Sequence, residues 1–346
     1  MSVAKKKKAN IEKPMALVEG VRQGEVRSIA RMISFAEANK KESFDALTEI
    51  YRSTGRAHII GVTGVPGSGK SSLVGALAKA IRNTGKTVGI VAIDPSSPFS
   101  GGAILGDRIR MTDLTGDDGV FIRSMATRGA MGGLARASLD TVDILDAAGF
   151  DIIIIETVGV GQDEVDIVRA AHTVTVVSAP GLGDEIQAIK AGILEIADIH
   201  VVSKCDRPDA YITISDINNM LALGSREPRR LSLFHTNNEQ KENVDLSIAN
   251  WQVSVIATSA ETGEGIDELL SIINDHIQYL NETGEIQDRR RDIIEMRVIK
   301  LTEDLIRKKF RGNHDKISSV IDSIMHRVIT PRQAAEELLK NFKYKE

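Results

Sequence analysis

Apolar and polar residues follow two different patterns along this chain, and the change between them falls near residue 57. Residues 14–56 carry apolar positions at helical spacing, as in Ile29, Ile33 and Ala36, and show no strand-like alternation. After them, short β-rich runs alternate with amphipathic helical segments. We therefore expect a helical N-terminal extension over residues 14–56 and a domain of mixed strands and helices over residues 57–280.

Several of the β-rich runs are apolar throughout, as expected for parallel strands that are covered on both faces. The predicted strands are His58–Thr63, Thr87–Ile93, Asp151–Ile155, Thr173–Ser178, His200–Ser203 and Gln252–Thr258. Helical spacing between them marks one helix by Leu73, Leu77 and Ile81, which Gly85 ends, and two more by residues 134–145 and 186–196. This alternation predicts a doubly wound, mostly parallel α/β sheet that binds its ligand at the carboxyl ends of the strands.

The last part of the chain, residues 281–346, contains helical patterns and no sheet-forming run. We expect helices over Asp292–Phe310 and Ile317–Val328, with Thr330-Pro331 as the N-cap and first turn of a third. Apolar positions on these helices need a surface to pack on. A partner subunit is the preferred interpretation, and folding back on the sheet is the alternative.

Composition excludes several classes of protein. The 346 residues include 42% hydrophobic and only 4% aromatic side chains, with a formal net charge of −4, so neither nucleic acid nor a membrane is an expected partner. No apolar run is long enough to span a bilayer. The single cysteine, Cys205, excludes an internal disulfide and fits a reducing, cytoplasmic setting. The lysines at 5–8 are interpreted as part of a solvated basic tail over residues 1–13.

The segment GVPGSGKS matches the phosphate-loop pattern G-x-x-x-x-G-K-[ST] and lies between a predicted strand and a predicted helix, which is the context this motif requires. Its backbone N–H groups can surround nucleotide phosphates, Lys70 can reach the β- and γ-phosphates, and the Ser71 hydroxyl can bind Mg²⁺. The expected phosphate-binding residues are Gly64, Val65, Pro66, Gly67, Ser68, Gly69, Lys70, Ser71 and Ser72.

Acidic residues follow two of the strands. Asp94 ends the second strand within DPSS, where it is either a magnesium ligand or a turn cap, and Asp107 is a weaker candidate for a magnesium contact. Glu156 opens ETVGVGQDE at the position of a Walker-B acid. In the same segment, Gly159 can offer its N–H to the γ-phosphate. Gln162 either positions the attacking water or is a solvated loop residue.

The segment SKCD follows another predicted strand and predicts guanine recognition. A carboxylate at Asp206 can accept from both N1–H and the 2-amino group of guanine, and the Lys204 stem can lie along the base. Ser203 stands where the usual signature has Asn or Thr. Ser259 and Ala260 in the segment TSA are expected to complete the base pocket. The seven histidines are scattered without metal-ligand spacing and are interpreted as surface or packing residues.

Taken in order, these motifs resemble the MeaB, MMAA and ArgK family of GTPases over about residues 14–280. The resemblance rests most on the strings DPSSPFSGGAILGDRIRM, SMATRGAMGGLA, ETVGVGQDEVD and APGLGDEIQAIKAGILEIAD. It implies a GTP- and GDP-binding hydrolase that uses Mg²⁺, with Ser71, Asp94, Asp107 and Glu156 as its magnesium and switch residues. Lys70, Glu156, Gln162 and Lys190 would be the catalytic residues, with Asp184 and Lys190 in a third switch that signals between nucleotide and partner.

The resemblance also implies a partner and an assembly. Such proteins are chaperones of adenosylcobalamin-dependent acyl-CoA mutases, above all methylmalonyl-CoA mutase, and form homodimers through a helical C-terminal arm, here residues 281–346. Two other functions stay open. One is a nickel, zinc or cobalt metallochaperone, which the lone cysteine and dispersed histidines disfavour. The other is a kinase or ATPase of basic amino acid transport, as the ArgK branch was labelled, which the expected guanine pocket disfavours.

Overall fold

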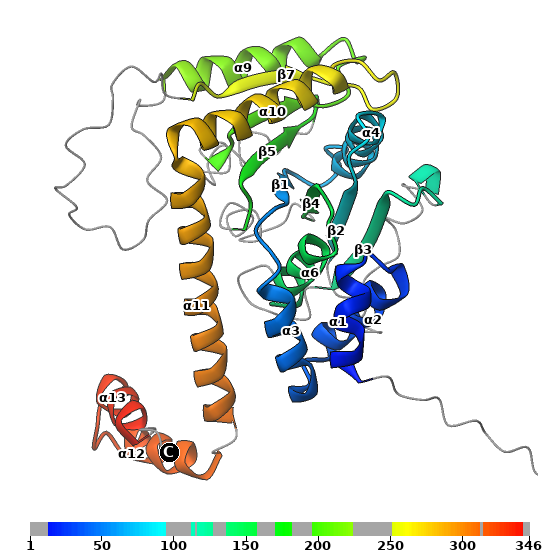
Figure 1. The fold of residues 1–346 in the computed structure, drawn as a ribbon. Helices are drawn as coiled ribbons and strands as arrows, with labels where there is room; N and C mark the ends of the chain where they lie inside the picture. The colour runs from blue at the N-terminus through cyan, green and yellow to red at the C-terminus, as the bar shows by residue number, and fades with distance from the viewer. Residues whose placement is uncertain are drawn as a thin grey trace, which may run out of the picture. The chain divides into compact units, whose positions relative to one another are not determined.

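The computed structural model describes residues 13–94, 112–114, 116–126, 136–157, 170–181, 196–223, 251–311 and 314–341. The chain divides into two compact units, Met1–Ile293 and Ile294–Glu346. Figure 1 shows the helices and strands of the chain. The first unit contains the sheet and the N-terminal helices, and the second consists of helices.

A seven-stranded sheet forms the centre of the first unit, with every neighbouring pair of strands parallel. Its strands are β1 (His58–Thr63), β2 (Val88–Asp94), β3 (Val120–Ala126), β4 (Ile152–Glu156), β5 (Thr173–Ser178), β6 (Ile199–Val202) and β7 (Ser254–Ala257). They lie in the order β3-β2-β4-β1-β5-β6-β7. The predicted doubly wound parallel α/β sheet is therefore confirmed, and the six predicted strands lie within two residues of their observed bounds.

The edge strand β3 is absent from the sequence prediction. Its sequence VFIRSMA is not a uniformly apolar run, because Arg123 and Ser124 interrupt the apolar residues. Arg123 is accommodated because its guanidinium forms an ion pair of 2.6 Å with Glu37 of the N-terminal helices. Arg123 weakens the strand pattern in the sequence, but its tertiary contact with Glu37 stabilises it in the folded strand.

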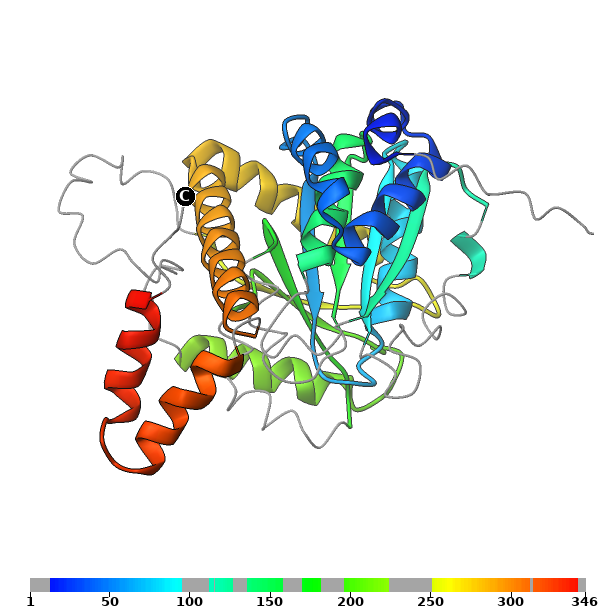
Figure 2. The same cartoon turned by 90° about the horizontal axis from the view of Figure 1, so that it is seen from below.

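Helices cover both faces of the sheet. The buried core on one face joins strand residues Ile60, Ile90 and Ile154 to α4 (Lys70–Asn83) and α10 (Ile266–Thr283). Gly89 points to the other face, where a Cβ would lie 3.0 Å from Cδ1 of Leu145 on α6 (Arg136–Ala147). Residues of alternate parity along β2 thus face different helices, as the pleat of a strand requires. Figure 2 shows this layering from below.

The N-terminal helices pack mainly on α6, and the second of them also contacts the edge strand β3 through the Arg123–Glu37 ion pair. They are α1 (Pro14–Arg22), α2 (Val26–Ala38) and α3 (Phe44–Tyr51), with a short 3₁₀ turn at Lys41–Ser43. The predicted apolar stripe of Ile29, Ile33 and Ala36 is buried. The segment that leads from α3 into β1 is held by Asp146 of α6, which accepts hydrogen bonds of 2.6–3.1 Å from the backbone N–H groups of residues 55–57. The helical extension is therefore joined to the sheet mainly through α6.

The C-terminal helices are α11 (Glu285–Arg311), α12 (His314–Met325) and α13 (Pro331–Asn341). The first begins seven residues earlier than the predicted Asp292. As expected, α13 starts at Pro331 behind Thr330. The N-terminus of α13 is capped by two reciprocal hydrogen bonds. Gln333 N donates to Thr330 Oγ1 at 3.3 Å, and Thr330 N donates to Gln333 Oε1 at 2.9 Å. In the described part of the chain, no helix combines the length and apolar character needed to cross a membrane.

Candidate nucleotide site

The phosphate loop joins the carboxyl end of β1 to the start of α4. Three of its glycines have positive φ, at 142° for Gly64, 81° for Gly67 and 86° for Gly69. Gly64 also approaches the neighbouring strand so closely that a Cβ would lie 2.0 Å from the carbonyl oxygen of Val177 on β5. The loop therefore requires glycine at Gly64 for both its backbone conformation and its packing.

Lys70 is the first residue of α4, and its side chain is buried. Its ammonium group donates hydrogen bonds to the loop carbonyls of Gly64 at 2.8 Å and Val65 at 3.0 Å. The positive charge is thereby held within the curve of the loop, next to the N-terminus of the helix. This is where the phosphates of a nucleotide would bring their negative charge.

Ser71 and Glu156 meet behind the loop. The Ser71 hydroxyl donates to Oε1 of Glu156 at 2.6 Å, and both side chains are buried. A hydroxyl whose hydrogen is taken by a carboxylate presents its lone pairs outward, and oxygen donors of this kind suit Mg²⁺. The residues present therefore fit a magnesium ion held with a nucleotide phosphate.

A pair of hydroxyl groups joins the ends of β1 and β4. Thr157 Oγ1 donates to Thr63 Oγ1 at 2.9 Å, and both residues are buried. Thr63 directly precedes the phosphate loop, and Thr157 directly follows Glu156. The sequence interpretation missed this pair, although the position of each residue next to a motif could have suggested it. The bond holds the ends of β1 and β4 at a fixed separation.

The SKCD segment contacts the phosphate loop directly. The Ser203 hydroxyl lies 2.5 Å from the carbonyl oxygen of Ser68 and 3.1 Å from that of Ser178, and Lys204 donates to the carbonyl of Gly67 at 2.9 Å. Ser203, which departs from the usual Asn or Thr, thus still forms a bridge to the loop. Asp206, three residues after Ser203, is exposed.

The TSA segment lies beside SKCD. The N–H of Cys205 donates to the carbonyl of Thr258 at 3.0 Å, which connects the two segments expected to surround a base. Ser259 is buried, and its hydroxyl accepts from the N–H of Thr262 at 3.3 Å. Burial and the nearby Glu264 carboxylate raise the pKa of the Cys205 thiol, which keeps it in its neutral form.

The remaining predicted site residues divide into two groups. Asp94 ends β2 two residues beyond Ala92, which pairs with Glu156, so its backbone lies at the same edge of the sheet as the phosphate loop. Asp107, Gly159, Gln162 and Lys190, together with Asp184, lie outside the described residues. Among the described residues, no group of three or more His, Cys, Asp or Glu side chains is arranged to hold a metal ion.

A phosphate loop at the carboxyl edge of an all-parallel sheet, with Lys70 and Ser71 opening the following helix, defines a P-loop nucleotide-binding protein. The family model of the methylmalonyl-CoA mutase-associated GTPase MeaB matches residues 29–315. The chain therefore belongs to the MeaB family of GTPases, and the family resemblance of its motifs is confirmed.

Relatives along nearly the whole chain support this membership. A Pyrococcus horikoshii protein assigned to the GTPases is 42% identical over 324 residues, which cover 94% of this chain and 96% of that one. The GTPase ArgK of Escherichia coli is 30% identical over 93% of this chain and 94% of its own. The mitochondrial methylmalonic aciduria type A homolog of Caenorhabditis elegans is 30% identical over 97% of this chain and 80% of its own.

The fold is also found in a solved structure. The crystal structure of a LAO/AO transport system kinase superposes with a TM-score of 0.69 and covers 97% of this chain and 99% of its own, at 24% identity. At this identity the likeness shows a shared fold. The kinase activity named for that protein is not carried over to this one.

Proposed function

We propose that this protein binds GTP with Mg²⁺, hydrolyses it, and uses the cycle to assist an adenosylcobalamin-dependent acyl-CoA mutase. The observation that carries the nucleotide part is the bond between Ser71 and Glu156 behind a glycine loop that encloses the Lys70 ammonium. Family membership supports the guanine nucleotide and the mutase partner.

Phosphoryl transfer to water requires positioning and charge neutralisation rather than a covalent intermediate. The loop N–H groups and Lys70 would bind the phosphates, and Ser71 with Glu156 would hold Mg²⁺, joined by Asp94 and Asp107. The ion supplies neutralisation of the charge that develops on the phosphate oxygens. Gly159, Gln162 and Lys190 are proposed to act from the segments that follow β4 and β5.

Guanine selectivity is assigned to Asp206, with Lys204 along the base and Ser259 and Ala260 closing the pocket. Lys204 has φ of 56° and its ammonium is tied to Gly67, so this segment is anchored to the phosphate loop before any base is bound. A pre-formed arrangement of this kind reduces the ordering cost of binding.

Calorimetric titration with a non-hydrolysable GTP analogue and its ATP counterpart tests this assignment. Wild-type protein should prefer the guanine analogue, and Asp206→Asn should remove about 100-fold of that preference, since it loses a charge-assisted pair of hydrogen bonds. Asp216→Asn, an exposed acid on α9 (Ala210–Leu223), serves as the matched control. Equal binding of both analogues by wild-type protein would overturn the guanine assignment.

The mutase role is tested by the rate of GTP hydrolysis with and without a purified adenosylcobalamin-dependent acyl-CoA mutase. We expect slow hydrolysis by the protein alone and acceleration by the mutase, because a partner completes many sites of this type. Fast hydrolysis that no mutase alters would contradict the chaperone role. Stoichiometric binding of nickel or zinc in equilibrium dialysis would favour a metallochaperone instead.

A homodimer is proposed for the C-terminal arm, residues 281–346. Four apolar side chains on α11 are 38–65% exposed and recur at spacings of four, three and four residues, the pattern of a helix that pairs with another helix: Ile294, Val298, Leu301 and Leu305. A second copy of the chain would cover this face. Light scattering should show a dimer for wild-type protein and a monomer for Leu305→Lys, and a monomeric wild-type protein would exclude the arrangement.

A further inference from the structure

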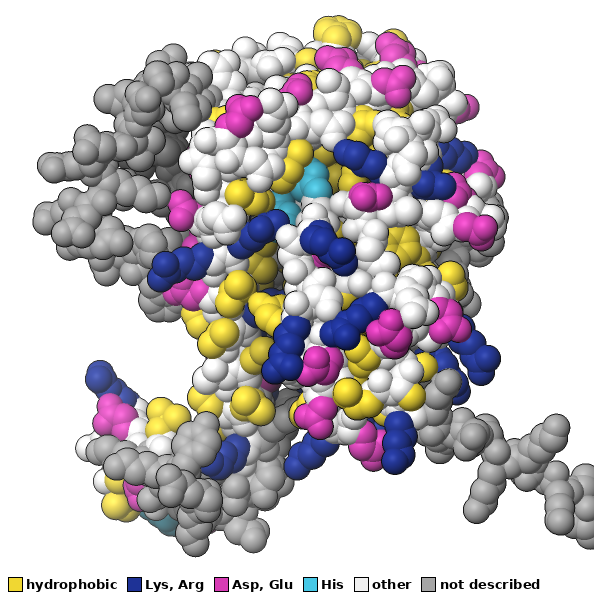
Figure 3. Space-filling model, in the orientation of Figure 1, with side chains coloured by type: hydrophobic (Ala, Val, Ile, Leu, Met, Phe, Trp, Pro, Cys, Tyr) yellow, Lys and Arg dark blue, Asp and Glu magenta, His cyan; other side chains and the backbone are white. Residues whose placement is uncertain are grey.

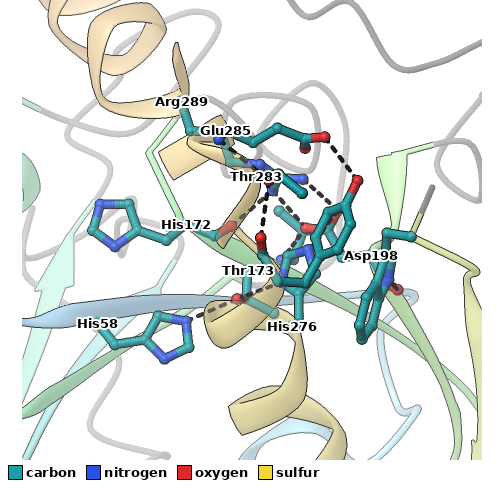
Figure 4. Close-up of polar contacts among 11 residues, drawn as sticks. His58, His172, Thr173, Asp198, His276, Thr283, Glu285 and Arg289 are labelled. Atoms are coloured by element: carbon teal, nitrogen blue, oxygen red, sulfur yellow. Dashed lines mark hydrogen bonds and ion pairs between the residues drawn. The ribbon is translucent and has the colours of Figure 1, made fainter. Parts of the chain in front are cut away.

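A buried polar cluster lies at the amino-terminal edge of the sheet, opposite the nucleotide site (Figure 4). At its centre, Arg289 of α11 binds Asp198 through two parallel contacts of 2.8 Å, from Nη1 to Oδ2 and from Nη2 to Oδ1. The Asp198 side chain is 3% exposed and that of Arg289 is 13% exposed. Two-point contacts in this geometry fix both distance and orientation, and burial protects them from screening by salt. We call Asp198 and Arg289 the edge pair.

The edge pair is bonded to the neighbouring strand. Oδ2 of Asp198 accepts from the N–H of Val174 at 2.8 Å, and Arg289 donates to the carbonyl of His172 at 2.7 Å. His172 and Val174 flank Thr173, the first residue of β5. Asp198 itself directly precedes β6. One ion pair therefore holds the starting points of two adjacent parallel strands.

A chain of hydrogen bonds extends the cluster to the strand that carries the phosphate loop. The Thr173 hydroxyl lies 2.8 Å from Nδ1 of His276 and 2.8 Å from Nε2 of His58, the first residue of β1. Figure 3 shows histidine side chains in a recess of the surface that is turned to the viewer. The cluster thus joins β1 and β5 at their first residues to Asp198, the residue directly before β6.

The same three strands end at the nucleotide site. Thr63 at the end of β1 leads into the phosphate loop, and Ser178 at the end of β5 lies beside the Ser203 hydroxyl. β6 is only four residues long and leads directly into Ser203. A strand of this length spans about 13 Å, so only this short strand separates Asp198 from the SKCD segment.

Helix α10 makes a second connection between the two edges. It begins beside the TSA segment, where a Cβ on Gly265 would lie 1.9 Å from the carbonyl of Ala257, so the backbones are in direct contact. Eleven residues later, His276 reaches the cluster, and Tyr279 donates to Glu285 of α11 at 2.8 Å. The first turn of α11 is therefore bonded to elements whose other ends surround the proposed base pocket.

We propose that Asp198 and Arg289 are positioning residues for the nucleotide site. Nucleotide binding in turn stabilises the backbone hydrogen bonds in the first turns of α11. The edge pair fixes the positions of β5 and β6 along the strand direction relative to β1. It thereby fixes where Ser203–Asp206 lie against the phosphate loop. Linkage requires the reverse effect, in which an ordered SKCD segment stabilises the edge pair. The inference rests on the proposed function, because it concerns the same nucleotide site.

The chain contains its own reporter of this coupling. Trp251 is the only tryptophan in the sequence, and its indole N–H donates to the carbonyl of Asp198 at 2.9 Å. Its ring centroid lies 4.6 Å from that of His276. Tryptophan emission responds to such close polar neighbours, so the fluorescence of the unlabelled protein reports on the cluster and not on the nucleotide site itself.

The test combines calorimetry and Trp251 fluorescence on wild-type protein, Arg289→Gln and Arg289→Lys, using a non-hydrolysable GTP analogue with Mg²⁺ well below the unfolding temperature. We expect Arg289→Gln to weaken binding about 10-fold or more and to abolish the change in Trp251 emission that the analogue causes in wild-type protein. Arg289→Lys keeps the charge and should recover part of both. Arg291→Gln, an exposed arginine two residues on, should behave as wild type.

An edge pair with a purely structural role would lower the unfolding temperature of Arg289→Gln but leave both its affinity and its fluorescence response unchanged, and that result overturns the inference. Should Arg289→Gln fail to fold, amide exchange of residues 285–293 in wild-type protein decides the question. Protection that increases with the analogue supports the coupling, and unchanged protection overturns it. Wild-type protein that binds no analogue refutes the proposed function itself, which is a different outcome from binding without coupling.

Discussion

Ser71 and Glu156 are 85 residues apart in the sequence, and their side chains are joined by a hydrogen bond of 2.6 Å. Ser71 is the second residue of α4 and Glu156 ends β4, so the bond links the helix that follows the phosphate loop to the strand beside β1. This relationship places two oxygen groups behind the loop, where a cation that accompanies the phosphates would bind.

Removal of this pair should change the requirement for magnesium. We expect Ser71→Ala and Glu156→Gln to raise the Mg²⁺ concentration for half-maximal binding of a GTP analogue about 10-fold or more, because each removes an oxygen donor or its orienting partner. Titration of Mg²⁺ at fixed nucleotide measures the effect. Ser34→Ala, at an exposed serine on α2, is the control. An unchanged Mg²⁺ requirement in both site variants would remove the pair from the metal site.

Gly64 should tolerate no side chain. Gly64→Ala places a Cβ 2.0 Å from a backbone carbonyl of β5, which cannot move without disturbing the sheet, so we expect a loss of about 3 kcal/mol or more of unfolding free energy. Gly85→Ala is the matched control, since it also has positive φ, of 84°, but meets no atom within 4 Å. It should cost only about 1 kcal/mol. Urea unfolding compares the two variants, and equal losses would show that φ alone matters at Gly64.

Ser203 and Asp206 should affect binding differently. The Ser203 hydroxyl contacts the carbonyl of Ser68 in the phosphate loop, so Ser203→Ala should weaken the GTP and ATP analogues alike, by about 5- to 10-fold for one lost hydrogen bond. Asp206→Asn should weaken only the guanine analogue. Calorimetry with both analogues separates the effects. A loss confined to the guanine analogue in Ser203→Ala would show that this serine serves the base instead.

Acid should destabilise the protein through His172. Burial, followed by the charges of Arg290 and Arg289, lowers the pKa of His172 from 6.5 to about 3, and its Nδ1 accepts a hydrogen bond from the N–H of Ile59. Between pH 6.5 and 3 the unfolded chain therefore binds a proton at this residue that the folded chain does not. Its contribution to stability is complete above pH 6.5 and is lost as the pH falls, by at most about 1.4 kcal/mol per pH unit.

The comparison with His172→Asn isolates this contribution, because the Asn side chain retains an acceptor but does not titrate. Urea unfolding between pH 7 and pH 4 should show a steeper loss of stability in wild-type protein than in the variant. Parallel curves for the two proteins would mean that His172 takes up its proton without cost in the folded state.

The phosphate loop and six strands could be predicted from the sequence because their signals are local. Glycines with a following Lys-Ser pair specify the loop, and uniformly apolar runs such as Ile152–Ile155 specify buried parallel strands. Strand β3 could not be predicted in this way. Arg123 interrupts its pattern, and the ion pair with Glu37 that makes the arginine acceptable comes from a helix 86 residues earlier.

The contacts at the two ends of the parallel strands show the same division. The sequence by itself determined the family and the phosphate loop, and it predicted a site role for Glu156, since each depends on residue types at short, fixed spacings. Only the tertiary structure decided that the Ser203 hydroxyl lies on the loop, that Thr63 meets Thr157, and that Asp198 binds Arg289. The physical reason is that hydrogen bonds and ion pairs between distant segments depend on strand order and register, which no local pattern of residues encodes.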